Sequence, residues 1–307
     1  MEAKFLIMGL PASGKTTFLA ALWHVVESDE IDCRLHLHRY EGDLAYLNQI
    51  AEAWRTFEKV PRTSQVGDID VKLHLVDRET GVKAAAFFPD LAGETFDVQV
   101  EDRRCRPEFV DDVGHGEGIL FFISADVRGD TLSVVELNAM MPPLAADDVG
   151  GTGAPATAPL AHSAEGLSGR ETADIAPPDA IEWEPKLVPA QVRVVQLLSD
   201  LQRAPFTPRH RRLAVMISAW DLTRGSGLGP DEWLATKMPL VDQFLRTNGQ
   251  SFEHRVYGVS AQGVRLDDAA AVGEAAMLTP SRRIEIVGPD GTGHDLTSPL
   301  VWLMPAG

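Results

Sequence analysis

Cysteine and positive charge are both scarce in this chain of 307 residues. Cysteine occurs only at Cys33 and Cys105, which excludes a disulfide framework and suits the reducing environment of the cytoplasm. Lysine and arginine number 28 against 45 aspartates and glutamates, so the formal net charge is -17. Such an acidic surface repels the phosphates of nucleic acids and of anionic membranes, and we expect neither as a partner.

Long apolar runs are also missing. No stretch approaches the roughly eighteen consecutive apolar residues that a membrane-spanning helix needs. A glycine-rich motif already begins at residue 9, so we expect no signal peptide before it. Hydrophobic residues nevertheless make up 44% of the chain, which is enough to build a core. We therefore expect a cytoplasmic protein.

The strongest signal lies in the first sixteen residues. Residues 4–8 form a short apolar run, and the next eight, Gly9-Leu-Pro-Ala-Ser-Gly14-Lys15-Thr16, match G-x-x-x-x-G-K-[ST] at every fixed position. A helical pattern of apolar residues follows at once. The two glycines let the backbone curl so that its N–H groups point at phosphate oxygens, next to the positive end of the helix. Strand before and helix after are the context that separates this motif from a chance match.

The motif predicts a set of nucleotide contacts. Lys15 reaches the outer phosphates of the nucleotide, and the Thr16 hydroxyl is placed to ligate Mg2+. We expect the whole loop to bind the nucleotide through Gly9, Pro11, Ala12, Ser13, Gly14, Lys15, Thr16 and Thr17.

Strand and helix patterns alternate along the rest of the chain, which is typical of an α/β fold. Residues 69–75 alternate strictly, a turn follows at 77–81, and 82–88 form a second strand, so these two strands are predicted to pair as an antiparallel hairpin. Continuous apolar runs at 118–124, 213–217 and 255–259 predict strands buried on both faces. The sequence thus predicts a mostly parallel sheet with one antiparallel strand.

Helices are predicted at 43–57, at 95–112 with an interruption near Pro107, at 189–201, at 230–246 and at 298–304. A tail hairpin is predicted at 284–291. Residues 141–187 are rich in Pro, Ala, Gly and acids and lack periodicity. Because the alternation resumes afterwards, we expect a flexible insertion within a single domain that covers 1–307.

A second motif lies where the hairpin ends. Asp90 follows an apolar strand, where a carboxylate can hold the water shell of Mg2+, and Gly93 offers an N–H to a terminal phosphate three residues later. Asp-x-x-Gly recurs by chance in many chains. Its position after a hairpin and within eighty residues of the phosphate-binding loop favours a functional role over a simple turn.

The order of these motifs over residues 4–262 resembles a Ras-like P-loop GTPase of the translation-factor-related class. The segment 33–58, the run from Trp54 to Thr63 and the phrase Phe-Pro-Asp-Leu-Ala-Gly-Glu at 88–94 look most similar to the bacterial double-GTPase families. This resemblance implies a three-layer α/β fold, GTP and GDP as ligands, and Mg2+ as cofactor. It also implies a protein partner, either an activator or a second GTPase, within a multi-gene system.

Carried over by position, the resemblance assigns further roles. Thr63 would ligate Mg2+ only when the terminal phosphate is present, with Ser64 as an alternative, and the loops at 60–67 and 91–106 would switch between ordered and mobile states. Asp90 would serve the metal, and Gly93 and Glu94 would join Lys15 and Thr63 in the catalytic set. Asp221 would read the guanine base, and Ser260 and Ala261 would brace it with backbone N–H groups.

Two departures from the family pattern affect these roles. The chain has Ser218-Ala219-Trp220-Asp221 where relatives carry a lysine in place of the alanine, so a turn residue is the alternative reading of Asp221. Glu94 stands where related enzymes often carry a glutamine that orients the attacking water. A carboxylate can accept a hydrogen bond from water but adds negative charge beside phosphates, so hydrolysis is expected to be slow or to depend on a partner.

Three alternatives remain at this stage. Arg103, Arg104 and Arg106 either supply a charge-stabilising finger or form surface ion pairs with Glu101 and Asp102, and the sequence favours the ion pairs. The chain could instead be an ATPase or small-molecule kinase, although such enzymes have no use for Asp-x-x-Gly after a hairpin. It could also be a nucleotide-dependent scaffold that does not hydrolyse its ligand.

Overall fold

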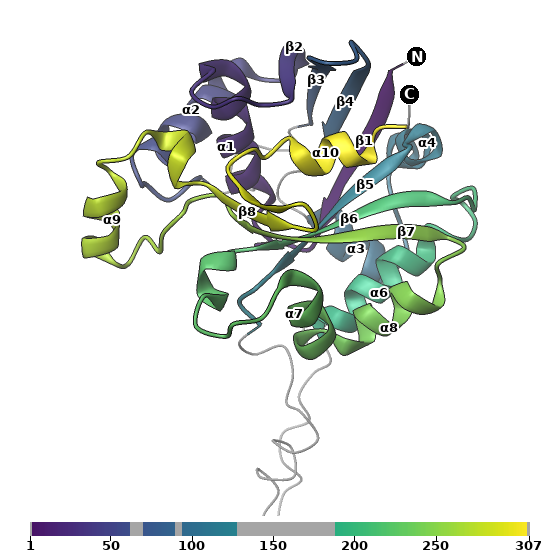
Figure 1. Cartoon of the computed structure of the whole chain (residues 1–307). Helices are drawn as coiled ribbons and strands as arrows, with labels where there is room; N and C mark the ends of the chain where they lie inside the picture. The colour runs from purple at the N-terminus through teal and green to yellow at the C-terminus, as the bar shows by residue number, and fades with distance from the viewer. Residues whose placement is uncertain (1, 62–69, 90–93, 128–187, 306–307) are drawn as a thin grey trace, which may run out of the picture. The chain divides into compact units, whose positions relative to one another are not determined.

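The structure is a computed structural model that describes residues 2–61, 70–89, 94–127 and 188–305 (Figure 1). Several sequence predictions lie outside these described residues: the roles of Thr63, Ser64, Asp90 and Gly93, and the insertion at 141–187. Glu94 is described only as the first residue of a helix. These predictions therefore stay predictions.

Within the described residues, the strands form one nine-stranded sheet in the order β2-β3-β4-β1-β5-β6-β7-β8-β9. Their bounds are β1 Ala3–Gly9, β2 Leu35–Glu41, β3 Val71–Asp77, β4 Lys83–Phe88, β5 Gly118–Ser124, β6 Arg211–Ser218, β7 Phe252–Ser260, β8 Glu285–Gly288 and β9 Gly291–Gly293. Strands β4, β1, β5, β6 and β7 pair in parallel. The parallel centre of the sheet confirms the predicted α/β class.

Antiparallel pairing occurs on both sides of this centre. Strand β3 pairs antiparallel with β4, as the hairpin pattern predicts, and also with β2. Strand β8 adds a second antiparallel strand, because the tail hairpin β8–β9 pairs with β7 and extends the sheet. The sequence pattern of residues 284–291 predicts the hairpin itself, but it does not indicate that the hairpin pairs with β7.

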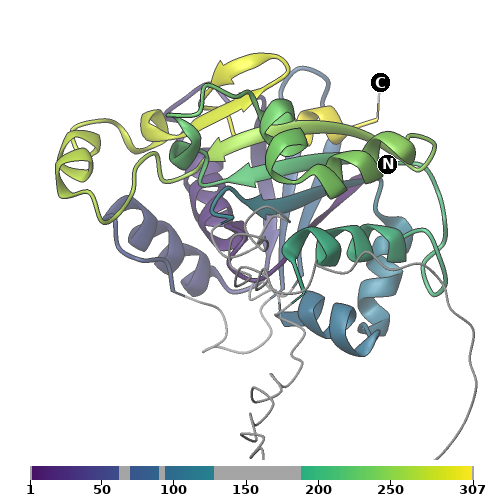
Figure 2. The same ribbon diagram turned by 90° about the horizontal axis from the view of Figure 1, so that it is seen from below.

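Helices cover both faces of the sheet, which gives the three layers of the P-loop fold (Figures 1 and 2). One core cluster contains the apolar faces of α1 Lys15–Ser28, α2 Leu44–Arg55 and α10 Ser298–Leu303. A second cluster, on the opposite face, contains those of α3 Glu94–Asp102, α4 Pro107–His115, α6 Ala190–Asp200, α7 Pro230–Lys237 and α8 Pro239–Thr247. None of the helices in the described residues is both long and apolar enough to cross a membrane.

The strands are buried on both faces because their apolar residues alternate between the two clusters. In β1, Phe5 and Ile7 belong to the first cluster, whereas Leu6 and Met8 belong to the second. A period of two makes successive side chains point to opposite faces, so an uninterrupted apolar run suits a strand between two helical layers.

The predicted helix over 230–246 is wrong in one respect, because it is two helices. The break lies at Met238, whose φ of −131° and ψ of 57° are not helical, and Pro239 opens α8. Proline lacks an N–H and disfavours the helical conformation in the residue before it. The same effect separates α3 from α4 at Pro107, as predicted. A further helix, α9 Ala269–Ala275, lies on an arm that projects away from the sheet (Figures 1 and 2).

Candidate nucleotide-binding site

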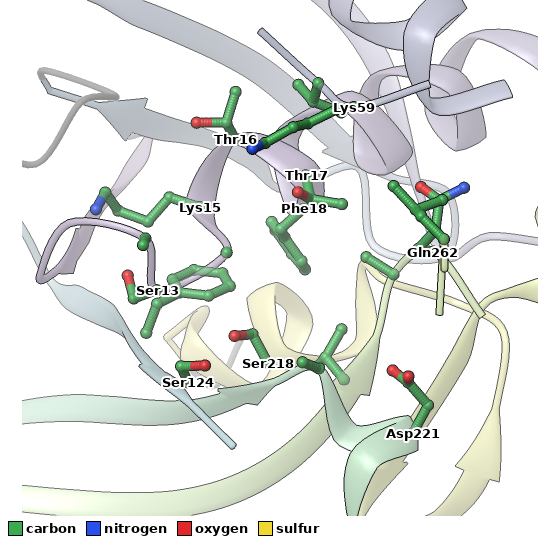
Figure 3. Close-up of a pocket in the computed structure, with 18 of the residues that line it drawn as sticks. Ser13, Lys15, Thr16, Thr17, Phe18, Lys59, Ser124, Ser218, Asp221 and Gln262 are labelled. Atoms are coloured by element: carbon green, nitrogen blue, oxygen red, sulfur yellow. The ribbon is translucent and has the colours of Figure 1, made fainter. Parts of the chain in front are cut away.

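A cavity of about 750 Å³ opens at the carboxyl ends of β1, β5, β6 and β7. Ligands of open α/β sheets bind at this edge, where helix N-termini and loops converge. Of the residues predicted to bind a nucleotide, those that line the cavity are Pro11, Ala12, Ser13, Gly14, Lys15, Thr16, Thr17, Asp221 and Ala261 (Figure 3). Three segments that are distant in the sequence therefore meet at one cavity.

The phosphate-binding loop needs glycine at both of its fixed positions. Gly9 has φ of +150°, and a Cβ atom there would lie 2.7 Å from the Phe122 carbonyl oxygen and 2.7 Å from Ser13 Oγ. Gly14 has φ of +90°, and its Cβ atom would lie 2.7 Å from Cβ of Ser218. Only glycine fits such backbone conformations at such close contact. Ser218, the first residue of the Ser-Ala-Trp-Asp segment, thus packs directly on the loop.

Lys15 begins α1 and lies inside the loop, with 3% of its surface exposed. Its Nζ atom donates hydrogen bonds to the carbonyl oxygens of Gly9 at 2.8 Å and Leu10 at 2.9 Å. The same atom lies 5.8 Å from the centre of the Phe96 ring in α3. The ammonium group is therefore held at the end of the cavity where α3 begins.

Asp221 follows β6 on a short 3₁₀ helix, Trp220–Thr223, and its carboxylate points into the cavity (Figure 3). Trp220 anchors this helix. Its ring is buried so tightly against β7 that a Cβ atom on Gly258 would lie 2.3 Å from Trp220 Cδ2, and it also contacts Trp233 edge to face. This packing holds Asp221 on the wall of the cavity that the phosphate-binding loop also lines, and its role in reading the base stays a prediction.

Ser260 and Ala261 have different surroundings. Ser260 is 1% exposed and lies behind the cavity wall, where its Oγ donates a hydrogen bond of 2.7 Å to Asp221 Oδ1. Ala261 lines the cavity, and its carbonyl oxygen accepts a hydrogen bond of 2.9 Å from Trp54 Nε1. The side-chain contact of Ser260 was not predicted, and the bracing of a base by the two backbone N–H groups stays a prediction.

Sequence reasoning missed two segments of the cavity wall. Residues 58–61, just after α2, line the cavity through Glu58, Lys59, Val60 and Pro61. Residues 264–267, at the base of the arm, line it through Val264, Arg265, Leu266 and Asp267. The first segment overlaps the predicted switch loop at 60–67, so only Glu58 and Lys59 were missed there. The second segment, residues 264–267, follows Ser260 and Ala261 in the sequence and carries no motif that would have predicted its place on the cavity wall.

The end of α2 is fastened to the loop after β7 and to the 3₁₀ helix Pro280–Arg283. Gln262 Nε2 donates to the Trp54 carbonyl at 3.1 Å, and Arg283 Nη2 donates to the same oxygen at 2.6 Å. The Arg283 guanidinium also lies 4.3 Å from the centre of the Trp54 ring and 4.1 Å from that of Phe57. These contacts place residues 58–61 at the mouth of the cavity.

Of the three predicted Mg2+ ligands, Thr16 lies within the described residues, whereas Thr63 and Asp90 do not. Thr16 belongs to the first turn of α1 and lines the cavity. In the described part of the chain, no group of three or more His, Cys, Asp or Glu side chains could hold a metal ion. Mg2+ bound with a nucleotide takes most of its ligands from phosphates and water and needs few from the protein. A hydroxyl beside the phosphate-binding loop fits that requirement.

Two of the three arginines that follow α3, Arg103 and Arg106, form ion pairs, as the sequence favours, but their partners differ from those predicted. Arg103 Nη2 lies 2.9 Å from Asp200 at the end of α6, and Arg106 Nη2 lies 3.4 Å from Asp70. Both partners are distant in sequence, so only the fold brings them together. One further acid of α3, Asp97, lines the cavity itself.

Comparison with curated proteins gave no match. Among solved structures, a nucleolar GTP-binding protein 1 from Plasmodium falciparum is 12% identical, with 90% of this chain and 86% of that chain covered and a TM-score of 0.35. The GTPase-like domain of Ski7 from S. cerevisiae, bound to GTP, is 10% identical, with 86% of this chain and 43% of that chain covered and a TM-score of 0.36.

The family model named Double-GTPase 1 matches residues 6–303, which is nearly the whole chain. Its span contains both the phosphate-binding loop and Asp221, which line the same cavity. The chain therefore belongs to the Double-GTPase 1 family and is a GTPase.

Proposed function

We propose that this GTPase is a Mg2+-dependent switch that acts with a protein partner, an activator or a second GTPase, in the cytoplasm of a bacterium and within a multi-gene system. One observation supports the nucleotide site most: the phosphate-binding loop and Asp221 line the same cavity of about 750 Å³. A cavity of this size is in the range that buries a nucleotide-sized ligand.

The residues of the loop bind the phosphates. Backbone N–H groups of the loop and of the first turn of α1 point at the phosphate oxygens, and the helix adds its positive end. Lys15 Nζ, which donates to the carbonyls of Gly9 and Leu10, is within the loop that would surround the β- and γ-phosphates. Turning from these carbonyls to a phosphate replaces neutral acceptors with charged ones, and charged acceptors make stronger hydrogen bonds.

Asp221 recognises the base at the other side of the cavity. Guanine presents N1–H and a 2-amino group as donors, and one carboxylate can accept from both. Ser260 holds one carboxylate oxygen at 2.7 Å, which orients Asp221 before the base binds. In relatives, the stem of a lysine at the position of Ala219 covers the base. Here Leu222, Val264 and Leu266 line the same cavity and supply apolar surface for the base instead.

When bound, Mg2+ would supply positive charge beside the phosphate oxygens. Thr16 would hold it, with Asp90 and Thr63 as the further candidates from the sequence. Switching is proposed for the segments 60–67 and 91–106. Each contributes described residues to the cavity wall: Val60 and Pro61 from the first, and Asp97 of α3 from the second. Glu94 directly follows Gly93, at the position where related enzymes often carry a glutamine, so its carboxylate is our candidate for orienting the attacking water.

The test is phosphate release under multiple turnover by the purified protein, with and without Mg2+, together with chromatography of the nucleotide released when the protein is denatured. We expect a guanine nucleotide to copurify and phosphate release from GTP to require Mg2+. A copurified adenine nucleotide, or release that is unaffected by chelation of Mg2+, would contradict the proposal. Slow release that a partner accelerates would assign the activator role to that partner.

A further inference from the structure

A carboxylate lies on the cavity wall at the end where the outer phosphates would bind. Asp97 belongs to α3 and lines the cavity. It follows Phe96, whose ring lies 5.8 Å from Lys15 Nζ, so this turn of α3 is beside the lysine. A carboxylate in this position repels a polyphosphate, and the repulsion is strongest for the nucleotide with the most negative charge.

This carboxylate has one ion-pair partner from another helix. Arg193 of α6 contacts Asp97 Oδ1 through Nη2. The side chain of Arg193 is 12% exposed and that of Asp97 is 29% exposed, so solvent screens the pair less than it screens a surface pair. Burial lowers the pKa of Arg193 from its ordinary value, but an arginine with a carboxylate partner keeps its proton at neutral pH.

The same interface has further polar contacts. Gln196 Nε2 donates a hydrogen bond of 3.0 Å to the Val100 carbonyl, and Asp200 accepts hydrogen bonds from Arg103 and Gln99. Four residues of α3 or its end are therefore held by α6. Of these contacts, the Arg193–Asp97 pair is the one whose acid lines the cavity.

We propose that Arg193 is a positioning residue for the triphosphate. Its guanidinium neutralises the Asp97 carboxylate on the cavity wall, so the contact between α3 and α6 sets how strongly the site prefers GTP over GDP. The proposal rests on the nucleotide site described above. GTP carries one more negative charge than GDP and places it at the outer end of the phosphate chain. Separating α6 from α3 would leave the Asp97 charge uncompensated there and would disfavour GTP more than GDP.

The experiment is a double-mutant cycle read out as equilibrium affinities for GTP and GDP. We expect Arg193→Ala to weaken GTP binding by about tenfold and GDP binding by about twofold, the scale of one partly buried charge interaction. Asp97→Asn alone should raise the preference for GTP, because the Arg193 charge then lacks its partner. The double variant Arg193→Ala/Asp97→Asn should restore the GTP:GDP ratio of the parent to within about twofold.

Two further variants separate charge from structure. Arg193→Lys retains the charge and should keep the ratio near that of the parent. Arg246→Ala is the matched control, because Arg246 pairs with Asp242 within α8 and neither residue lines the cavity, so its loss should leave both affinities unchanged. An equal loss for both nucleotides in Arg193→Ala, or a double variant as poor as the single one, would overturn the proposal. If Arg193→Ala does not fold, an unchanged ratio in Asp97→Asn would overturn it.

Lys15→Ala distinguishes a failure of this inference from a failure of the site. If Lys15→Ala binds both nucleotides as tightly as the parent, the nucleotide site lies elsewhere and both proposals are wrong. If binding depends on Lys15 but the GTP:GDP ratio is the same in all the Arg193 and Asp97 variants, the site stands and only the role of Arg193 is wrong.

Discussion

Ser260 donates a hydrogen bond of 2.7 Å from its Oγ to Oδ1 of Asp221, which joins the end of β7 to the 3₁₀ helix after β6. Ser260 is buried, whereas Asp221 reaches the cavity. A donor behind the carboxylate sets its orientation, so the other oxygen lone pairs are available to a ligand. The proposed recognition of the base by Asp221 would then depend on a residue that does not line the cavity.

Ser260→Ala should therefore weaken GTP binding without changing the fold. A hydrogen bond to a charged group contributes roughly 1.5–3 kcal/mol, and loss of the orienting bond should cost about tenfold in affinity for GTP. The affinity can be measured by calorimetric titration of GTP. Ser226→Ala is the control, since Ser226 is exposed and its Oγ accepts only a local backbone bond from Leu228. An unchanged affinity for GTP would show that Asp221 needs no orientation by Ser260.

Lys15→Ala should abolish measurable nucleotide binding while the chain stays folded. The variant leaves the outer phosphates without the ammonium, and charge-assisted hydrogen bonds of this kind contribute roughly 1.5–3 kcal/mol each. It also loses the bonds to the Gly9 and Leu10 carbonyls, so a decrease of a few degrees in Tm is expected. Lys83→Ala, at an exposed lysine of β4, is the control for both measurements. Nucleotide binding at the parent's affinity would contradict the phosphate-loop assignment.

Glu94→Ala should reduce hydrolysis more than binding. A group that orients water acts on the transition state and contributes little to the ground state, so the variant should keep the parent's affinity for GTP. Single-turnover hydrolysis of prebound GTP gives the chemical step directly. If that rate is unchanged, Glu94 takes no part in the reaction, and catalysis depends on a partner or does not occur.

Acid stability provides a test outside the nucleotide site. Burial alone would raise the pKa of Asp77, but hydrogen bonds from Arg34 and from the backbone of Glu79 and Thr80 outweigh it and lower the pKa from its ordinary value. A lowered folded-state pKa stabilises the fold above the unfolded pKa of about 4, and this contribution is lost as pH falls through the folded-state value.

Asp77→Asn should consequently lower the free energy of unfolding at neutral pH by about 1–2 kcal/mol. The deficit relative to the parent should shrink as the pH falls below about 4, where the parent carboxylate also becomes neutral. Thermal unfolding of both proteins between pH 3 and pH 7 measures this difference. A deficit that is equal at every pH would show that the turn geometry, and not the charge, accounts for it.

The sequence was sufficient for the elements whose geometry is local. The spacing of Gly9, Gly14 and Lys15 determines a loop between a strand and a helix, because each glycine occupies a backbone position that excludes a Cβ atom. The apolar run of β5 likewise predicts a strand between two helical layers, and its residues do alternate between the two core clusters. In both cases, residues close in sequence carry the whole physical cause.

The rest of the site depends on contacts between segments distant in sequence. Residues 264–267 reach the cavity through a connection that has no pattern of its own. Asp97 lies in a predicted helix, but nothing in the sequence indicated that it would line the cavity. Arg193 and Asp97 are 96 positions apart in the sequence, so no spacing rule could pair them. The break at Met238 is different: Pro239 was visible in the sequence, but the amphipathic pattern on either side of it suggested one helix.

The assignment of guanine depends on Asp221 more than on any other residue. Adenine has an acceptor at N1 and no amino group at position 2, so a carboxylate facing it loses both hydrogen bonds while staying desolvated. A site built on polar pairing rejects the ligand that lacks the partner groups by up to roughly four to five orders of magnitude. We expect a smaller ratio here, because Ala219 provides no stem to cover the base.

The most direct test is a competition titration of GTP, XTP and ATP against the parent and against Asp221→Asn. An amide turns one acceptor into a donor, which suits the carbonyl that xanthine carries at position 2. The parent should prefer GTP, and the variant should bind GTP more weakly and XTP more tightly, with ATP weak for both proteins. A parent that prefers ATP, or a variant that gains no affinity for XTP, would contradict base recognition by Asp221.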